Sequence, residues 1–322
     1  MARVSEAERQ EFRKLLDRHR AVTILSHIRP DPDAIGTSLG LYAVLKKAGY
    51  RVEIANATRP LPRVLDFLEG FGRIKGKIDY DDSLVIACDC GSIDRLGFDV
   101  AGREMVVIDH HPSNTGFGTL NVVDPSAVSS SEVAFALLAP DFEIPPAGAE
   151  AFYAALLSDT RNFTLPSVTA ETFALAQDLI ARGVDPGAVA QQMLQRRSLA
   201  SLRILGRAIN SLRLYLEGKV AVMIVTREDL EATGAEETDL EGVADYGRSL
   251  ATVRVAVLMV ERPGGWKVSL RSKGEDVMSV ALAFGGGGHR AAAGFEKADI
   301  SGEALLEALL ERINIEKEDI RS

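Results

Sequence analysis

Three of the five histidines in this 322-residue chain stand next to aspartates, directly after short apolar runs. The run AVTILSH ends in His27 and is followed by Asp31 and Asp33. The run SLVIACD ends in Asp89, and MVVIDHH ends in Asp109, His110 and His111. Runs of this length that are rich in Val and Ile are typical of β-strands. Because the carboxyl ends of parallel strands lie along one edge of a sheet, we expect these side chains to meet in one cleft.

Carboxylates that share a cleft need compensating positive charge, because like charges at short range raise each other's pKa. The donors here are oxygen and imidazole without a thiolate, which favours Mn²⁺ or Mg²⁺ over a structural zinc. Two such ions about 3.5 to 4 Å apart activate a water molecule and stabilise the entering and leaving oxygens of a phosphoryl displacement. The pattern therefore predicts a divalent-metal site suited to phosphoryl displacement.

The elements that position these groups alternate between apolar strands and amphipathic segments in the first half of the chain, which indicates an α/β domain with a largely parallel sheet. We expect strands at 21–27 and 51–56 and two more that end near Asp89 and Asp109. A helix is expected at 38–50, after a loop that carries the D-x-D aspartates, and another at 149–159. Ser129 and Glu132 have the spacing of a capping box.

The second half of the chain predicts a smaller α/β domain after a helical segment rich in arginine. We place the first domain at 1–190, a helical connector at 191–215 and the second domain at 216–322. Strand-like runs in the second domain are KVAVMIV, VRVAVLMVER and WKVSLRS. The Gly-rich stretch GGGGHR follows them, and a terminal helix closes the domain.

The net charge of −9 provides no global basic field, so binding of long duplex nucleic acid is not expected. A small anionic substrate bound by metal and local cations remains compatible with this charge. The N-terminal segment mixes both charges, and no apolar run is long enough to span a bilayer. Cys88 and Cys90 are two apart in one strand-like run, so we expect both to pack behind the sheet without a disulfide. A reducing cytoplasmic location is therefore expected.

The segment H-x-x-P-D-x-D-A-I-G-T, followed downstream by D-H-H, resembles the DHH phosphoesterase superfamily, and GGGGHRAAAGF at 285–295 resembles its DHHA1 partner domain. The resemblance covers nearly the whole chain. It is strongest to the stand-alone oligoribonuclease, or nanoRNase, branch, which also removes the 3′-phosphate of 3′-phosphoadenosine 5′-phosphate.

The resemblance implies two Mn²⁺ ions, with Mg²⁺ or Co²⁺ as alternatives. It places His27, Asp31 and Asp89 on one ion, and Asp33, Asp89, His110 and Asp159 on the other, so that Asp89 bridges them. Asp109 would orient its neighbours, and His111 would contact the scissile phosphate. Asp159 stands in SDTRNF, where Arg161 replaces the glycine of the family's D-T-G.

In the second domain, the resemblance implies that the substrate is bound by SLRSKG and the Gly-rich loop. The residues are Arg271, Ser272, Gly286, Gly287, Gly288 and His289. Arginine presents a bidentate fork to phosphate, and successive glycines allow backbone N–H groups to approach an anion.

The expected activity is hydrolysis of short RNA oligonucleotides to nucleoside monophosphates, with release of AMP from 3′-phosphoadenosine 5′-phosphate as a second reaction. Two alternatives stay open, a phosphodiesterase for linear or cyclic dinucleotides and a catalytically silent nucleotide sensor. A homodimer also stays open as a mode of assembly.

Overall fold

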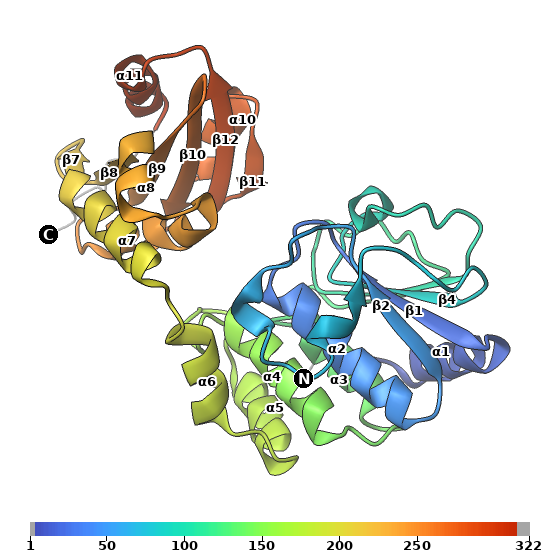
Figure 1. The fold of residues 1–322 in the computed structure, drawn as a ribbon. Coiled ribbons are helices and arrows are strands. Elements are labelled where there is room, and N and C mark those ends of the chain that lie inside the picture. Colours follow the sequence, from blue (N-terminus) through green and yellow to red (C-terminus); the bar gives the residue numbers. More distant parts are fainter. Residues whose placement is uncertain (1–3, 314–322) are drawn as a thin grey trace, which may run out of the picture. The chain divides into compact units, whose positions relative to one another are not determined.

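The computed structural model describes residues 4–313 of the chain. The chain divides into two compact units, residues 1–196 and residues 197–322, each with its own sheet (Figure 1). The division falls inside the 191–215 segment, where a break at 195–198 separates two helices. The segment 191–215 contains the end of a helix at Pro186–Leu194, a helix at Leu199–Ser211 and a short strand at Arg213–Tyr215.

The first unit is built on a six-stranded sheet in which every neighbouring pair is parallel. Its strands are β1 Ala21–Ser26, β2 Arg51–Ala55, β3 Ile74–Lys75, β4 Leu84–Cys88, β5 Met105–Asp109 and β6 Leu120–Val123, in the order β3-β2-β1-β4-β5-β6. The direction of this order reverses between β1 and β4. In open α/β sheets such a reversal leaves a crevice at the carboxyl ends of the two strands, where ligands bind.

Helices pack on one face of this sheet, and loops cover the other face. The helices of the unit are α1 Glu6–Arg18, α2 Pro32–Lys47, α3 Ser130–Leu138, α4 Pro146–Asp159, α5 Ala170–Ala181 and α6 Pro186–Leu194, with short 3₁₀ turns at Arg63–Leu65, Phe71–Arg73 and Ile93–Leu96. The α/β fold with a parallel sheet, expected from the alternation of strands and helices, is confirmed.

Helix α2 begins six residues earlier than its expected range of 38–50. Asp31 is its N-cap and accepts a hydrogen bond from the Ala34 N–H at 3.0 Å, while Pro32 occupies the first helical position. Proline fits there because the N–H that it lacks would have no partner within the helix. The expectation that Asp33 lies in a loop is therefore wrong, because Asp33 is in the first turn of α2.

Two glycines allow α2 to lie close against α4. A Cβ on Gly36 would lie 2.7 Å from the Ala151 carbonyl oxygen, and one on Gly40 would lie 2.3 Å from the Phe152 ring. Phe152 is fully buried and cannot move aside. Close packing here sets the position of the last turn of α4, where Asp159 lies.

The left-handed conformation of Asp89, with φ +52°, changes the expected placement of the cysteines. Both thiols are free and buried, but Cys88 packs among the helices and Cys90 belongs to the cluster on the loop-covered face. The prediction of a shared face is wrong, because the regular alternation of a strand stops at Asp89.

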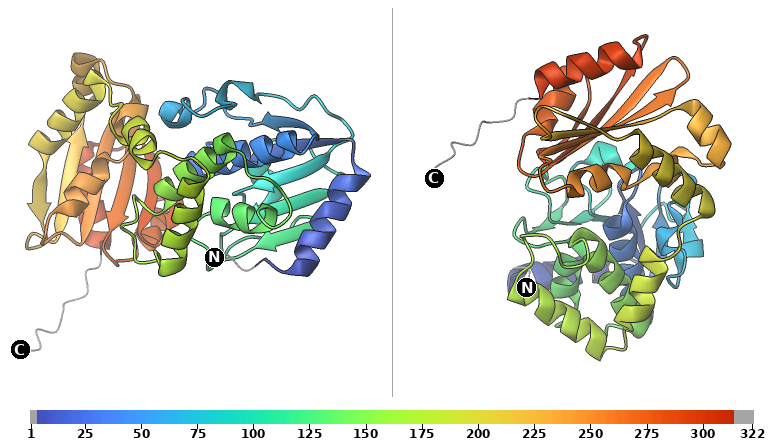
Figure 2. Two further views of the ribbon diagram at one scale, coloured as in Figure 1. Left: turned by 90° about the horizontal axis from the view of Figure 1, so that it is seen from below. Right: turned by 90° about the vertical axis from the view of Figure 1, so that its left-hand side faces the viewer.

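The second unit contains a mixed six-stranded sheet (Figure 2). Its strands are β7 Arg213–Tyr215, β8 Val220–Val225, β9 Val255–Arg262, β10 Gly265–Ser272, β11 Gly287–His289 and β12 Ala292–Ala298, in the order β11-β12-β10-β9-β8-β7. Only β8 and β9 pair in parallel. A smaller α/β second domain is thus confirmed.

Helices cover both faces of this second sheet. The elements are α7 Leu199–Ser211, α8 Arg227–Thr233, the 3₁₀ turn η4 Glu237–Leu240, α9 Val243–Ser249, α10 Val277–Ala283 and α11 Gly302–Arg312. Helices α10 and α11 pack on one face, and α7, η4 and α9 pack on the other. Among residues 4–313, no helix has the length and apolar content that a membrane crossing requires.

We predict that Gly40→Ala lowers the free energy of unfolding by about 1 to 3 kcal/mol, because the added methyl group overpacks a site filled by the Phe152 ring. Calorimetry of the first unit's transition measures the change. Gly72→Ala is the matched control, since a Cβ there meets nothing within 4 Å. Equal stability of the two variants would contradict the close packing of α2 on α4.

Candidate metal centre

The side chains singled out at the strand ends of the first unit come together at the reversal between β1 and β4. Three groups of ligand atoms each lie within 4.8 Å of one another: His27 with Asp31 and Asp89, Asp33 with His110 and Asp159, and Asp89 with His110 and His111. Asp89 and His110 each belong to two of the groups, so the whole set forms one continuous cluster.

Two histidines turn the same ring atom towards the carboxylates. The Nε2 atom of His27 lies 3.5 Å from Asp89, and that of His110 lies 3.4 Å from Asp159 and 3.7 Å from Asp89. Their Nδ1 atoms face backbone carbonyl oxygens, at 2.8 Å to Ile28 and 3.3 Å to Ala127. A proton on Nδ1 leaves the Nε2 lone pair pointing into the cluster, which is the tautomer that binds a metal ion.

Asp33 is fully buried and receives the first N–H groups of helix α3. The backbone N–H of Ser130 donates to it at 2.7 Å and that of Ser131 at 3.3 Å, while the Thr37 hydroxyl donates at 3.1 Å. A helix N-terminus favours a negative charge at this position. Burial nevertheless raises the pKa of Asp33 well above its usual range, and the nearby carboxylates of Asp159 and Asp89 raise it further.

Asp159 is the last residue of α4 and shares this unfavourable environment. Burial raises its pKa well above the usual range, and the charges of Asp89 and Asp31 add to the effect. Asp89 differs, because hydrogen bonding to His27 and the charges of His111 and His110 outweigh its burial and lower the pKa to about 2. The cluster therefore holds more carboxylates than its own histidines neutralise, which fits an environment built for cations.

Asp109 is completely buried and is surrounded by donors from its own loop. One carboxylate oxygen accepts from the His110 N–H at 2.8 Å and lies 2.7 Å from the His111 Nδ1 atom, and the other accepts from the Asn114 amide at 2.6 Å. The hydrogen bond to Asp109, aided by the charge of Asp89, outweighs burial and raises the pKa of His111 to about 9. This hydrogen bond therefore favours the imidazolium form of His111.

The segment after Asp159 keeps a glycine-like backbone although Arg161 stands where the family has glycine. Arg161, Asn162 and Phe163 all have positive φ angles, at +46°, +59° and +60°. The Thr160 hydroxyl anchors this turn, since it donates to the Leu156 carbonyl at 2.7 Å and accepts from the Phe163 N–H at 3.1 Å. Asp159 remains in the cluster, and the strained backbone lies at residues 161–163.

Besides Thr37, sequence reasoning did not find Ser130, Asn114 and Arg95, which also contact the cluster. The Ser130 hydroxyl donates to Asp89 at 2.9 Å, the Asn114 amide donates to Asp109, and an Arg95 guanidinium nitrogen lies 3.2 Å from the His27 Nδ1 atom. Asn114 lies three residues beyond His111 and could have been noticed. Ser130 follows the expected cap, in which Ser129 accepts from the Glu132 N–H and the Glu132 carboxylate accepts from the Val128 N–H.

The substrate-binding candidates of the second unit are divided between the two faces of its sheet. Arg271 and His289 both pair with Ala292 from opposite sides, so cross-strand register puts them on one face. Ser272 points the other way, is buried, and donates its hydroxyl hydrogen to the Glu275 carbonyl at 2.6 Å. Gly287 and Gly288 lie in the short edge strand β11, and Gly286 precedes it.

Comparison with known proteins agrees with both halves of the structure. A model of the DHH family N-terminal domain matches residues 21–157, and a model of the DHHA1 domain matches residues 217–316. The bifunctional oligoribonuclease and PAP phosphatase NrnA of Thermus thermophilus is 32% identical over 92% of this chain and 90% of its own length. This chain belongs to the DHH/DHHA1 phosphoesterase family.

Other members of this family give a similar picture. NrnA of Bacillus subtilis is 29% identical to the present DHH/DHHA1 chain, over 88% of this chain and 91% of its own. The cyclic-di-AMP phosphodiesterase PdeA of Listeria monocytogenes is 26% identical over 91% of this chain and 47% of its own. The crystal structure of an exopolyphosphatase-related protein from Bacteroides fragilis superimposes with a TM-score of 0.87 at 26% identity, over 95% of this chain and 96% of the other.

We predict that Mn²⁺ stabilises this DHH/DHHA1 protein more at about pH 8 than at about pH 5.5. Asp33 and Asp159 have raised pKa values in the folded, metal-free state, so their contribution to stability is present at low pH and is lost as the pH rises through those values. Bound cations remove this loss, and one site adds about 2.7 kcal/mol at about 100 times its Kd. Thermal unfolding with Mn²⁺ or with EDTA measures the difference.

The control for this measurement is Asp81→Asn, which changes an exposed aspartate just before β4, at the opposite end of that strand from Asp89. It should keep the full pH-dependent effect of Mn²⁺, whereas Asp33→Asn should reduce it. A Mn²⁺ effect that is the same at both pH values in the unaltered protein would argue against a metal site made of these carboxylates.

Proposed function

We propose that this chain hydrolyses short RNA oligonucleotides to nucleoside monophosphates in a Mn²⁺-dependent reaction, and that it also removes the 3′-phosphate of 3′-phosphoadenosine 5′-phosphate. The proposal rests above all on the cluster of His and Asp side chains at the reversal of strand order, with two imidazoles turned Nε2 inward. Support comes from the relatives named as oligoribonuclease and PAP phosphatase, which match this chain over most of their length.

The residues present fit two divalent cations. In this proposal His27, Asp31 and Asp89 hold one ion, and Asp33, Asp89, His110 and Asp159 hold the other. Such a pair, when bound, activates a water molecule and neutralises charge on the phosphate. Manganese suits a mixed set of carboxylate oxygens and imidazoles without thiolates, and Mg²⁺ and Co²⁺ are the alternatives to be compared.

His111 is the proposed cation for the scissile phosphate. Its Nδ1 atom lies 2.7 Å from Asp109, which sets the orientation of the ring and raises the pKa of His111. A charged donor held in place before the substrate arrives stabilises negative charge that develops on phosphate oxygens. Asp109 acts through His111 and is a positioning residue in this scheme.

In the second unit we propose that Arg271, His289 and the backbone of Gly286, Gly287 and Gly288 contact the substrate. Arg271 and His289 share one face of the sheet on either side of Ala292, which offers a guanidinium group and an imidazole to an anionic group. We also propose Ser272 as a substrate-binding residue, because it belongs to the same sequence motif. Its hydroxyl donates to the Glu275 carbonyl, which stabilises the turn next to Arg271.

One alternative has an observation in its favour, since the cyclic-di-AMP phosphodiesterase PdeA also matches this chain. A phosphodiesterase for linear or cyclic dinucleotides would use the same cluster. A silent nucleotide sensor would bind a nucleotide without turnover, and the complete His/Asp cluster argues against it.

A panel of substrates with Mn²⁺, Mg²⁺ or Co²⁺ separates these functions. Di- to pentaribonucleotides, longer RNA, single-stranded DNA, 3′-phosphoadenosine 5′-phosphate and cyclic di-AMP are incubated with the pure protein, and initial rates are compared. We expect the short ribonucleotides to be hydrolysed fastest with Mn²⁺. Fastest hydrolysis of cyclic di-AMP would replace the oligoribonuclease assignment, and binding without turnover of any substrate would favour the sensor.

We predict that Asp89→Asn lowers kcat on a diribonucleotide by about 10²- to 10³-fold or more, because it removes the charge shared by both proposed ion sites. Asparagine keeps the size of the side chain and tolerates the positive φ of this position. Asp81→Asn should leave kcat unchanged. Wild-type turnover by Asp89→Asn would contradict the assignment.

A further inference from the structure

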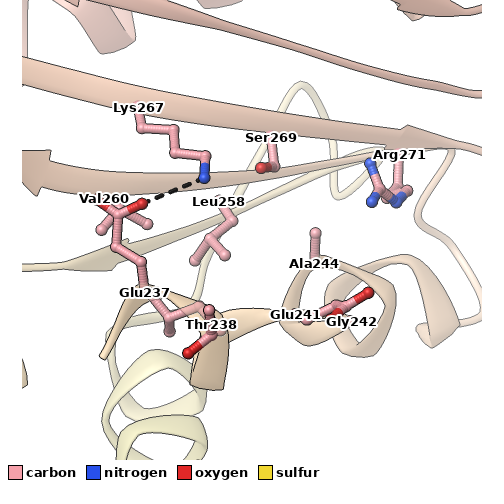
Figure 3. A pocket seen from close by; sticks show the side chains of 11 residues that line it. Glu237, Thr238, Glu241, Gly242, Ala244, Leu258, Val260, Lys267, Ser269 and Arg271 are labelled. Carbon is pink, nitrogen blue, oxygen red and sulfur yellow. Dashed lines mark hydrogen bonds and ion pairs between the residues drawn. The ribbon is translucent and has the colours of Figure 1, made fainter. Parts of the chain in front are cut away.

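The second unit contains a cavity of about 330 Å³ that is built from one face of its sheet and the segment carrying η4 and α9 (Figure 3). All residues that line it lie between 237 and 271, so the second unit forms it alone. This volume is at the lower end of the range for small-molecule pockets. It accommodates a single nucleotide-sized ligand and not a folded partner.

The floor of the cavity is apolar and comes from strand β9. Leu258 and Val260 project from alternate positions on the face that also packs against α7 and α9. Ala244 of α9 points towards the same space (Figure 3). A methyl group there, in place of a larger side chain, helps to keep the slot open. An apolar floor favours a ring system over a bare inorganic anion.

The wall of the cavity is polar and is formed by every second residue of β10. Lys267, Ser269 and Arg271 line up along the strand (Figure 3). At one end, the Lys267 ammonium group lies 3.2 Å from Glu237, which also pairs with Arg262. The Arg271 end lies roughly 13 Å further along the strand, at about 3.3 Å for each residue.

The two ends of the cavity therefore differ in chemistry. The Lys267 end offers both a donor and a carboxylate acceptor, a combination that matches the mixed donor and acceptor edge of a nucleobase. The Arg271 end offers a guanidinium group, which suits a phosphate. Because Glu237 lies 3.2 Å from Lys267 and Asp245 lies 3.8 Å from Arg271, this is not a general anion site.

We propose that this cavity is a nucleoside pocket, in which the base of a terminal nucleotide lies on Leu258 and Val260 and its edge contacts Lys267 and Glu237. The sugar passes Ser269, and the phosphate points to Arg271. This inference rests on the proposed function for its ligand class. It adds a site for the base to a set of candidates that otherwise contact only phosphate.

The first test is binding without catalysis. AMP, GMP, CMP and UMP are titrated calorimetrically into the full chain in EDTA, so that the metal centre does not contribute. We expect Ala244→Leu, which fills the slot, to weaken binding by about tenfold or more. Ala232→Leu changes an exposed alanine of α8 and should bind as the unaltered protein does. No binding of any mononucleotide, or equal binding by both variants, would overturn the pocket.

Lys267→Met provides a second variant that keeps the length of the side chain and introduces no steric clash. Glu237 retains Arg262 as a partner, so the local structure should persist. We expect this variant to change the order of preference among the four mononucleotides, because it removes a donor to the base edge. If both the order of preference and the affinities stayed unchanged, Lys267 would not recognise the base.

Turnover separates this inference from the proposed function. Ala244→Leu should raise KM for a diribonucleotide by about tenfold while hydrolysis of bis(4-nitrophenyl) phosphate, which has no base, stays the same. Normal turnover with an unchanged KM would reject the pocket and keep the enzyme assignment. The opposite result is a protein that hydrolyses none of the substrates but binds mononucleotides, with weaker binding in Ala244→Leu. That result would keep the pocket and reject the enzyme assignment.

Discussion

Repulsion among buried carboxylates is the constraint on which the first unit depends. Asp33, Asp89 and Asp159 come from α2, the end of β4 and the end of α4, and they meet around the His110 ring. The cost of gathering these charges is reduced by the α3 N-terminus, by hydroxyl donors and by imidazoles, but raised pKa values at Asp33 and Asp159 show that this reduction is incomplete. The remaining deficit of positive charge is what makes the cluster suitable for divalent cations.

The surrounding architecture holds these groups in place against that repulsion. Close packing of α2 on α4 through Gly36 and Gly40 fixes two of the contributing elements relative to one another. The edge-to-face contact of Phe135 with Phe152 joins α3 to α4, with ring centroids 6.3 Å apart. Apolar packing away from the cluster therefore keeps three helix termini directed at it.

Much of this arrangement could be predicted from the sequence, because strand ends and motif residues coincide. The parallel sheet, the meeting of His27, Asp89 and His110, and the mixed α/β second unit all follow from local patterns. The early start of α2 was missed because Asp31 and Pro32 were read as a loop, although an N-cap followed by proline is a helix start signal.

Other features were beyond local reading. The left-handed conformation of Asp89 puts the two cysteines on opposite faces of the sheet. No residue type in this strand-like run indicates that conformation. Ser130 and Arg95 approach the cluster only through tertiary structure, since their partners are 41 and 68 residues away in the chain. Of the residues that line the cavity of the second unit, only Arg271 was singled out from the sequence, because the rest of the lining depends on which β10 residues face α9.

The Gly-rich run of the second unit has a practical consequence for mutational scanning. A side chain at Gly286 would collide with the Gly294 carbonyl oxygen, and one at Gly288 would collide with Ala293, so changes at either position report on packing before they report on ligand contact. Gly285 has open space but a φ of +81°, which disfavours other residues. Gly287 alone in this run combines open space with an ordinary backbone. It is therefore the one position of the four where adding bulk can probe main-chain recognition without first disturbing the strand.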